Sequence, residues 1–128
     1  MPRLYSVAEA NALLPELTGV LEDLQVQAAR LAAVQAELQE VRKHLQGNGH
    51  GRHAEELVGQ AAVAEHDLRR GLTWLQERDI ELKDLHKGLI DFYHEREGRR
   101  VYLCWFLGEP SVAYWHTLEG GFAAREPL

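Results

Sequence analysis

Polar side chains gather among aromatic ones in the last third of the chain. Eight of the ten Phe, Trp and Tyr residues lie between Phe92 and Phe122. Polar groups in such surroundings either satisfy one another or bind a ligand. Six residues are therefore candidates for ligand binding: Asp91, Trp105, Glu109, His116, Glu119 and Arg125.

His116 is the residue best suited to chemistry, because imidazole exchanges protons near neutral pH and binds metals. His116 has two possible roles. Its ring either packs at a sheet edge against a hydrogen-bond partner, or it acts as an acid, a base or a metal ligand. A small enzyme, metal-dependent or not, would use His116 with Asp91, Glu109 or Glu119.

Asp91, Cys104 and His116 form a candidate metal-binding trio, with oxygen, sulfur and nitrogen donors. The strand register that the turn lengths predict places Asp91 beside Cys104 but His116 on the opposite face, which counts against the trio. A slip of one residue at either turn would reverse that conclusion. We predict no other cofactor.

Three further histidines lie close together near a glycine-rich segment: His44, His50 and His53. Imidazoles at this spacing can hold a transition metal. On a flexible loop such binding is usually adventitious, and we give the group no functional role.

Arg125 follows the aromatic region, and two roles suit it. Its planar guanidinium can pair with Glu109 and dock the C-terminal tail on the sheet, or it can bind a carboxylate or phosphate on a ligand. Cys104 is expected to be an inert buried thiol, because Asp91 beside it would raise its pKa.

The first half of the chain is rich in Ala and Leu and predicts a long helix. Ser6 and Glu9 fit a capping box, so the helix should start at Val7. Pro15 predicts a kink or break near Leu14. Apolar residues then repeat every seven positions and form a seam, as in a coiled coil. Only Gln27 interrupts this seam. Either Gln27 lies near an edge of the seam, or it is a buried polar residue that fixes the register. The seam comprises Leu17, Val20, Leu24, Gln27, Leu31, Val34, Leu38, Val41 and Leu45.

A turn at Gly47–Gly51 leads to a second predicted helix from Ala54 to Arg78. Small residues line one face of this helix, so its partner can approach closely, above all at Gly71. Residues 6–78 should thus form an antiparallel helical hairpin with its tip at residues 47–51. Apolar residues on its flanks predict a homodimer through the helices: Leu13, Leu21, Ala28 and Val58.

Residues 79–128 alternate between apolar and polar side chains and predict a small antiparallel sheet with a C-terminal tail. The expected strands are 80–83, 89–95, 100–107 and 112–116, with turns at Glu97-Gly98 and at 108–111. A four-residue turn at 108–111 pairs Leu103 with His116 and Cys104 with Trp115. Neither face is plainly polar, so we expect the helices to cover one, and a partner chain or the tail to cover the other.

Composition excludes several classes of protein. The 128 residues, with a formal charge of −6, suit one α+β domain and disfavour nucleic acid as a partner. No apolar run is long enough to span a membrane. The single cysteine fits the reducing cytoplasm. Short basic runs at Arg69-Arg70 and Arg96–Arg100 are expected to be solvated.

The chain resembles a bacterial family known as domain of unknown function 2203. Residues 101–110 (VYLCWFLGEP) carry the clearest likeness, with Ala113–His116, Gly121-Phe122, Arg125 and Pro127. Upstream, 80–84, 88–92 and 5–15 fit as well, so the resemblance covers essentially the whole chain. The chain departs from it at Tyr93, where proline is expected, and at Arg78-Asp79, where glycine is expected to end the second helix. The resemblance implies no activity.

The sequence therefore predicts a homodimeric cytoplasmic module that binds a protein or a small molecule at the aromatic surface around His116 and Arg125. The small enzyme based on His116 is the alternative.

Overall fold

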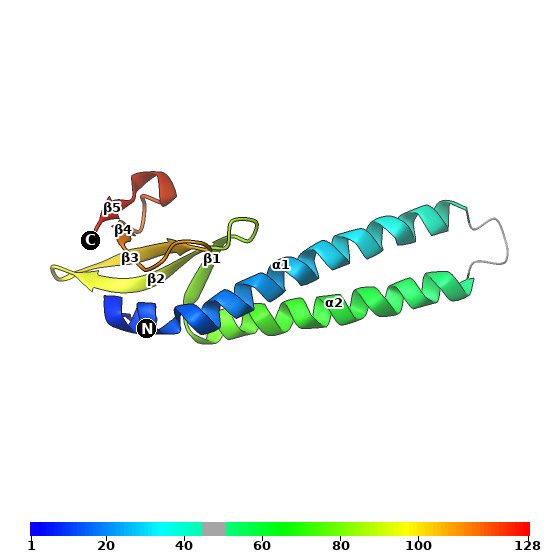
Figure 1. Ribbon diagram of the computed structural model, residues 1–128, viewed down its shortest axis with the longest axis horizontal. Coiled ribbons are helices and arrows are strands. Elements are labelled where there is room, and N and C mark those ends of the chain that lie inside the picture. Colours follow the sequence, from blue (N-terminus) through cyan, green and yellow to red (C-terminus); the bar gives the residue numbers. More distant parts are fainter. Residues whose placement is uncertain (45–50) are drawn as a thin grey trace.

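A computed structural model describes residues 1–44 and 51–128. It confirms the α+β fold: two long helices form a hairpin, and an antiparallel sheet follows (Figure 1). The elements are α1 (Val7–Lys43), α2 (Gly51–Glu77), β1 (Ile80–Asp84), β2 (Leu89–Arg96), β3 (Arg99–Phe106), β4 (Tyr114–His116), the short 3₁₀ helix η1 (Phe122–Ala124) and β5 (Glu126–Pro127).

Helix α1 begins where the capping box predicts. The Ser6 hydroxyl accepts from the Glu9 backbone N–H at 3.0 Å, and the Glu9 carboxylate accepts from the Ser6 N–H at 2.8 Å. The expected break near Leu14 is wrong, because α1 runs through Pro15 as one helix. Leu14 and Leu17 are buried on either side of Pro15. Burial of two leucines offsets the roughly 3 kcal/mol that an internal proline costs.

The seam between the helices contains most of the predicted residues. Leu17, Leu24, Val34 and Leu38 are buried, whereas Leu31 is half-buried. Gln27 is also buried, at 9% exposure. Its amide nitrogen donates to Asp23 at 3.4 Å. Leu45 and residues 47–50 of the predicted tip lie outside the described residues.

The two helices pack closely at Gly71, as predicted. A Cβ atom at Gly71 would lie 2.5 Å from Cδ2 of Leu24, a fully buried side chain. Helix α2 starts three residues earlier than expected and ends at Glu77. Asp79 then adopts a left-handed conformation with φ of 55°, which explains why glycine is expected there.

The five strands lie in the order β1-β2-β3-β4-β5, all antiparallel. The turn at Glu97-Gly98 has positive φ at both residues, which gives the predicted pairing of Asp91 with Cys104. The predicted pairing of β3 with β4 is wrong by one residue. His116 lies opposite Tyr102, and Tyr114 lies opposite Cys104.

The connection from β3 to β4 explains this difference. It spans residues 107–113 and is not a four-residue turn. Val112 is buried, and its N–H donates to the side chain of Asn11 on α1 at 2.8 Å, so this residue packs against the helix and stays out of β4. The indole N–H of Trp105 donates to the backbone carbonyl of Glu109, with Nε1 3.0 Å from the oxygen. The distant contact with Asn11 and the local bond between Trp105 and Glu109 together shift the register.

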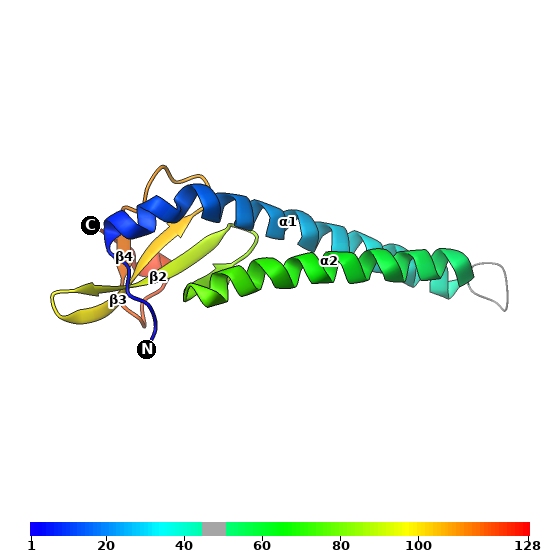
Figure 2. The ribbon, with the colours of Figure 1, turned by 90° about the horizontal axis from the view of Figure 1, so that it is seen from below.

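The two faces of the sheet have different covers. The first part of α1 crosses one face (Figures 1 and 2), where Ile90, Phe92 and Leu103 are fully buried. Leu21 belongs to this core, so its expected place on an exposed flank is wrong. The C-terminal tail, residues 117–128, lies on the other side of the sheet and adds β5 as an edge strand (Figure 1). Among the described residues, no helix is long and apolar enough to cross a membrane.

We predict opposite effects for two Gly→Ala substitutions in α2. Gly71→Ala should lower the free energy of unfolding by about 1–2 kcal/mol, because the new methyl group overpacks against Leu24. Gly59→Ala should raise the free energy of unfolding by about 0.5–1 kcal/mol. A Cβ atom at Gly59 would have no heavy atom of another described part of the chain within 4 Å, and alanine favours the helix. Urea unfolding at one protein concentration measures both. Equal gains from the two substitutions would contradict the close packing at Gly71.

Candidate functional site

Asp91 and His116 form a buried pair on the face of the sheet that the tail covers. Nε2 of His116 lies 3.1 Å from both carboxylate oxygens of Asp91. The two side chains are each 2% exposed. Asp91 comes from β2 and His116 from β4, and Tyr102 and Cys104 of β3 lie between them in the sheet. The register thus places His116 on the same face as Asp91, against the sequence prediction.

Two backbone groups of the tail contact the second nitrogen of the His116 ring, Nδ1. Nδ1 lies 2.7 Å from the Thr117 carbonyl and 3.1 Å from the Gly121 N–H. When Nδ1 carries a proton it donates to Thr117, and when it does not it accepts from Gly121. The ring also packs 5.4 Å from that of Tyr102. Its orientation is therefore fixed in either protonation state.

Cys104 completes a cluster of three possible metal ligands. One donor atom each from Asp91, Cys104 and His116 lies within 4.8 Å of the others, and all three residues are buried. Burial, together with the negative charge of Asp91, raises the pKa of the Cys104 thiol to about 12. The thiol is therefore neutral, as expected for an unreactive cysteine. Burial also raises the pKa of Asp91, against the opposing effect of His116.

This set of donors fits a transition metal. Oxygen, sulfur and nitrogen ligands are those that Zn²⁺ accepts, and three protein ligands leave one position open in a tetrahedral site. A cavity of about 180 Å³ adjoins the three side chains. It is also lined by Lys83, Leu89, Tyr102, Leu118, Glu119, Gly121 and Phe122.

Glu119 and Trp105 occupy different surroundings. Glu119 is exposed and lines the cavity from the tail. Trp105 points into the core on the helix side of the sheet. Trp105 is therefore separate from His116, and its part in the structure is the bond to the Glu109 carbonyl.

Glu109 and Arg125 form an ion pair that holds the tail. Nη2 of Arg125 lies 2.7 Å from both Glu109 carboxylate oxygens, and both side chains are largely buried. The guanidinium also lies 4.1 Å above the ring of Tyr114 and 4.8 Å from that of Phe122. Arg125 thus has the tail-docking contacts, and its Nε is buried with no hydrogen-bond partner among the described residues.

A network of polar residues that the sequence analysis did not single out continues from the cavity along the same face. Lys83 contacts Glu81 at 2.6 Å, the Tyr93 hydroxyl donates to Glu81, and Tyr102 donates to Tyr93 at 3.4 Å. The bond to Glu81 raises the pKa of Lys83, so the ammonium stays charged. One sequence signal marks part of this network: Glu81 and Lys83 alternate along the strand predicted for residues 80–83.

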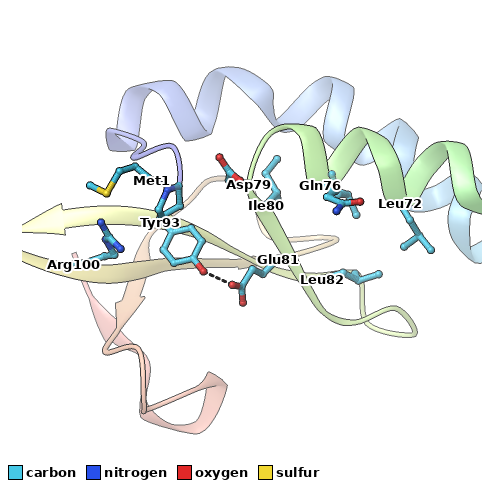
Figure 3. A pocket seen from close by; sticks show the side chains of 11 residues that line it. Met1, Leu72, Gln76, Asp79, Ile80, Glu81, Leu82, Tyr93 and Arg100 are labelled. Carbon is cyan, nitrogen blue, oxygen red and sulfur yellow. Dashed lines mark hydrogen bonds between the residues drawn. The ribbon is translucent and has the colours of Figure 1, made fainter.

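A wider open groove of about 630 Å³ lies beside this network, near the N-terminus. Figure 3 shows the Tyr93–Glu81 hydrogen bond in its middle, Arg100 towards one end and Leu72 towards the other. Its carboxylates are already engaged, since Asp79 accepts from the Arg3 N–H at 2.8 Å. The groove therefore offers less for recognition than the cavity at His116.

The histidines near the hairpin tip are far less enclosed. His53 lies 3.2 Å from Glu37, and His44 lies 3.9 Å from Glu40. Both imidazoles are exposed, and His50 lies outside the described residues.

The fold and site define a class: a small α+β protein in which a long helical hairpin carries a sheet with a polar cluster under the C-terminal tail. Residues 3–128 match the family described as "Uncharacterized conserved protein (DUF2203)". The chain belongs to this family, as the resemblance predicted. No curated protein and no solved structure matches it.

We predict that Arg125→Ala lowers the free energy of unfolding by about 1–3 kcal/mol, because a largely buried carboxylate loses its charged partner. Amide hydrogen exchange should also quicken in residues 117–128. Glu126→Gln, which removes an exposed charge nearby, should leave both unchanged. Unaltered exchange in Arg125→Ala would show that the ion pair does not hold the tail.

Proposed function

We propose that this protein is a binding module that holds one divalent transition-metal ion between Asp91, Cys104 and His116. One observation supports the proposal most strongly: three different donor types converge in a buried site beside a cavity. The ion would take the place of the protons that these side chains now carry or share. Zn²⁺ is the metal that this donor set suits best.

The contacts around the ligands support the same proposal. Metal-bound histidines usually engage their second nitrogen with a carbonyl or another polar group, and Nδ1 of His116 contacts Thr117 and Gly121. The cavity gives the fourth position of the ion access to a small molecule. The alternative of a metal-dependent enzyme would use that position, with Glu119 on the cavity wall. Glu109, the third partner considered for His116, is engaged with Arg125 instead.

We also propose that the protein pairs with a second copy through the hairpin and acts in the cytoplasm. Exposed apolar side chains along both helices support pairing: Val26, Val58 and Val63 are 60%, 46% and 51% exposed. The free thiol of Cys104 supports a reducing compartment.

Zinc binding is tested on tag-free protein in which His44, His50 and His53 are replaced by Gln, which removes the rival site near the tip. Equilibrium dialysis with elemental analysis should find one Zn²⁺ per chain. Cys104→Ser should weaken binding by at least about 100-fold, because loss of a ligand costs more than loss of a partner in the outer shell.

His66→Gln, which removes an exposed imidazole on α2, is the matched control and should bind as the parent does. Zinc below about one tenth of an equivalent in the parent, at a free concentration expected to saturate the site (roughly 100-fold weaker binding than expected), or zinc that Cys104→Ser leaves unaffected, would refute the site. Asp91 and His116 would then be a structural pair only.

Pairing of two copies is tested by native mass spectrometry. The wild-type protein should show the mass of two chains. Val58→Asp should shift it to one chain, because a carboxylate would be buried in the contact, while helicity stays unchanged. Thr73→Asp, at an exposed position of the same helix, should remain paired. A single-chain mass for the wild type would contradict the proposal.

A further inference from the structure

The cavity beside His116 combines a cation with apolar walls. Lys83 lies at its rim, and its ammonium is 5.0 Å from the centre of the Tyr102 ring. That ring in turn packs on His116. Leu89, Leu118 and Phe122 supply the apolar part of the lining. A molecule inside would therefore meet the metal ligands on one side, a positive charge on another and carbon atoms elsewhere.

The volume of the cavity limits the size of its occupant. About 180 Å³ corresponds to roughly six water molecules at ~30 Å³ each. A ligand of a few non-hydrogen atoms fills this space, and a nucleotide or a peptide would extend beyond it.

Charge limits the occupant further. A divalent ion bound by the Asp91 carboxylate, the Cys104 thiolate and a neutral His116 has no net charge. One added negative charge would face the Lys83 ammonium, which also pairs with Glu81 outside the cavity. A second negative charge would have no partner among the lining residues and would face Glu119 at the cavity wall. A monoanion is therefore favoured over a dianion such as phosphate.

We infer that the cavity binds a small monocarboxylate, whose oxygen completes the coordination of the metal ion while its charge faces Lys83 and its carbon atoms contact Leu89 and Phe122. This inference rests on the proposed metal site. Lys83 would act as a specificity residue and not as a metal ligand.

The test uses the protein without the three tip histidines, loaded with Co²⁺ in place of Zn²⁺. The visible spectrum of bound Co²⁺ reports the thiolate and the number of ligands. Acetate, added at constant ionic strength, should change the spectrum in a saturable way, whereas acetamide, which has the same shape and no charge, should not.

Lys83→Met should weaken the binding of acetate about tenfold or more, because a charge-assisted contact is lost. Lys43→Met removes the same charge from the far end of the hairpin and should leave the affinity for acetate within about twofold, since a distant exposed charge is screened. Neither substitution should alter the stoichiometry of Co²⁺. Phosphate should bind more weakly than acetate.

The outcomes separate the two proposals. Absence of a bound Co²⁺ spectrum overturns the metal site and this inference with it. A metal spectrum that acetate does not change overturns the inference alone. Equal acetate affinity in Lys83→Met, or tighter binding of phosphate, also overturns the inference.

Discussion

The buried contact between Asp91 and His116 constrains the second half of this structure. A carboxylate and an imidazole that are each 2% exposed must satisfy each other, because an unpaired charge would destabilise the interior strongly. Their contact is made only when His116 lies opposite Tyr102 and not opposite Leu103. A slip of one residue would turn His116 towards the apolar core beneath α1. The buried Asp91 carboxylate would then lose its contact with the imidazole. The pair therefore specifies the register of β4, and through β4 the position of the tail.

The first helix links the two halves of the molecule. Its N-terminal part covers the sheet, and the remainder of its 37 residues, about 55 Å in all, pairs with α2. The core around Leu14, Leu17 and Leu21 is shared by helices and sheet. Asn11 at the same end of α1 accepts from Val112 and so shapes the loop before β4. The hairpin thus contributes directly to the geometry of the site.

Local sequence signals predicted the parts of the fold that depend on local chemistry. The capping box at Ser6, the close approach at Gly71 and the Glu97-Gly98 turn each act within a few residues or one packed helix pair. The register of β4 could not be found in this way, because a side chain 101 residues away fixes Val112. The sequence consequently disfavours the metal trio, because the register it predicts for β4 is wrong by one residue. Lys83 and Tyr102 were missed because a cavity becomes visible only after the tail has been placed.

The polar groups under the tail explain how this face of the sheet can be stable without a ligand and still have donor atoms that would bind a metal ion. Without a metal, burial keeps Cys104 protonated and raises the pKa of Asp91, which His116 opposes. A divalent ion would compete with those protons for donor atoms that β2, β3 and β4 already hold together, and little rearrangement would be needed. The Arg125–Glu109 ion pair keeps the tail, and with it Thr117 and Gly121, against His116. Tail docking and ligand geometry are therefore coupled through the orientation of a single imidazole ring.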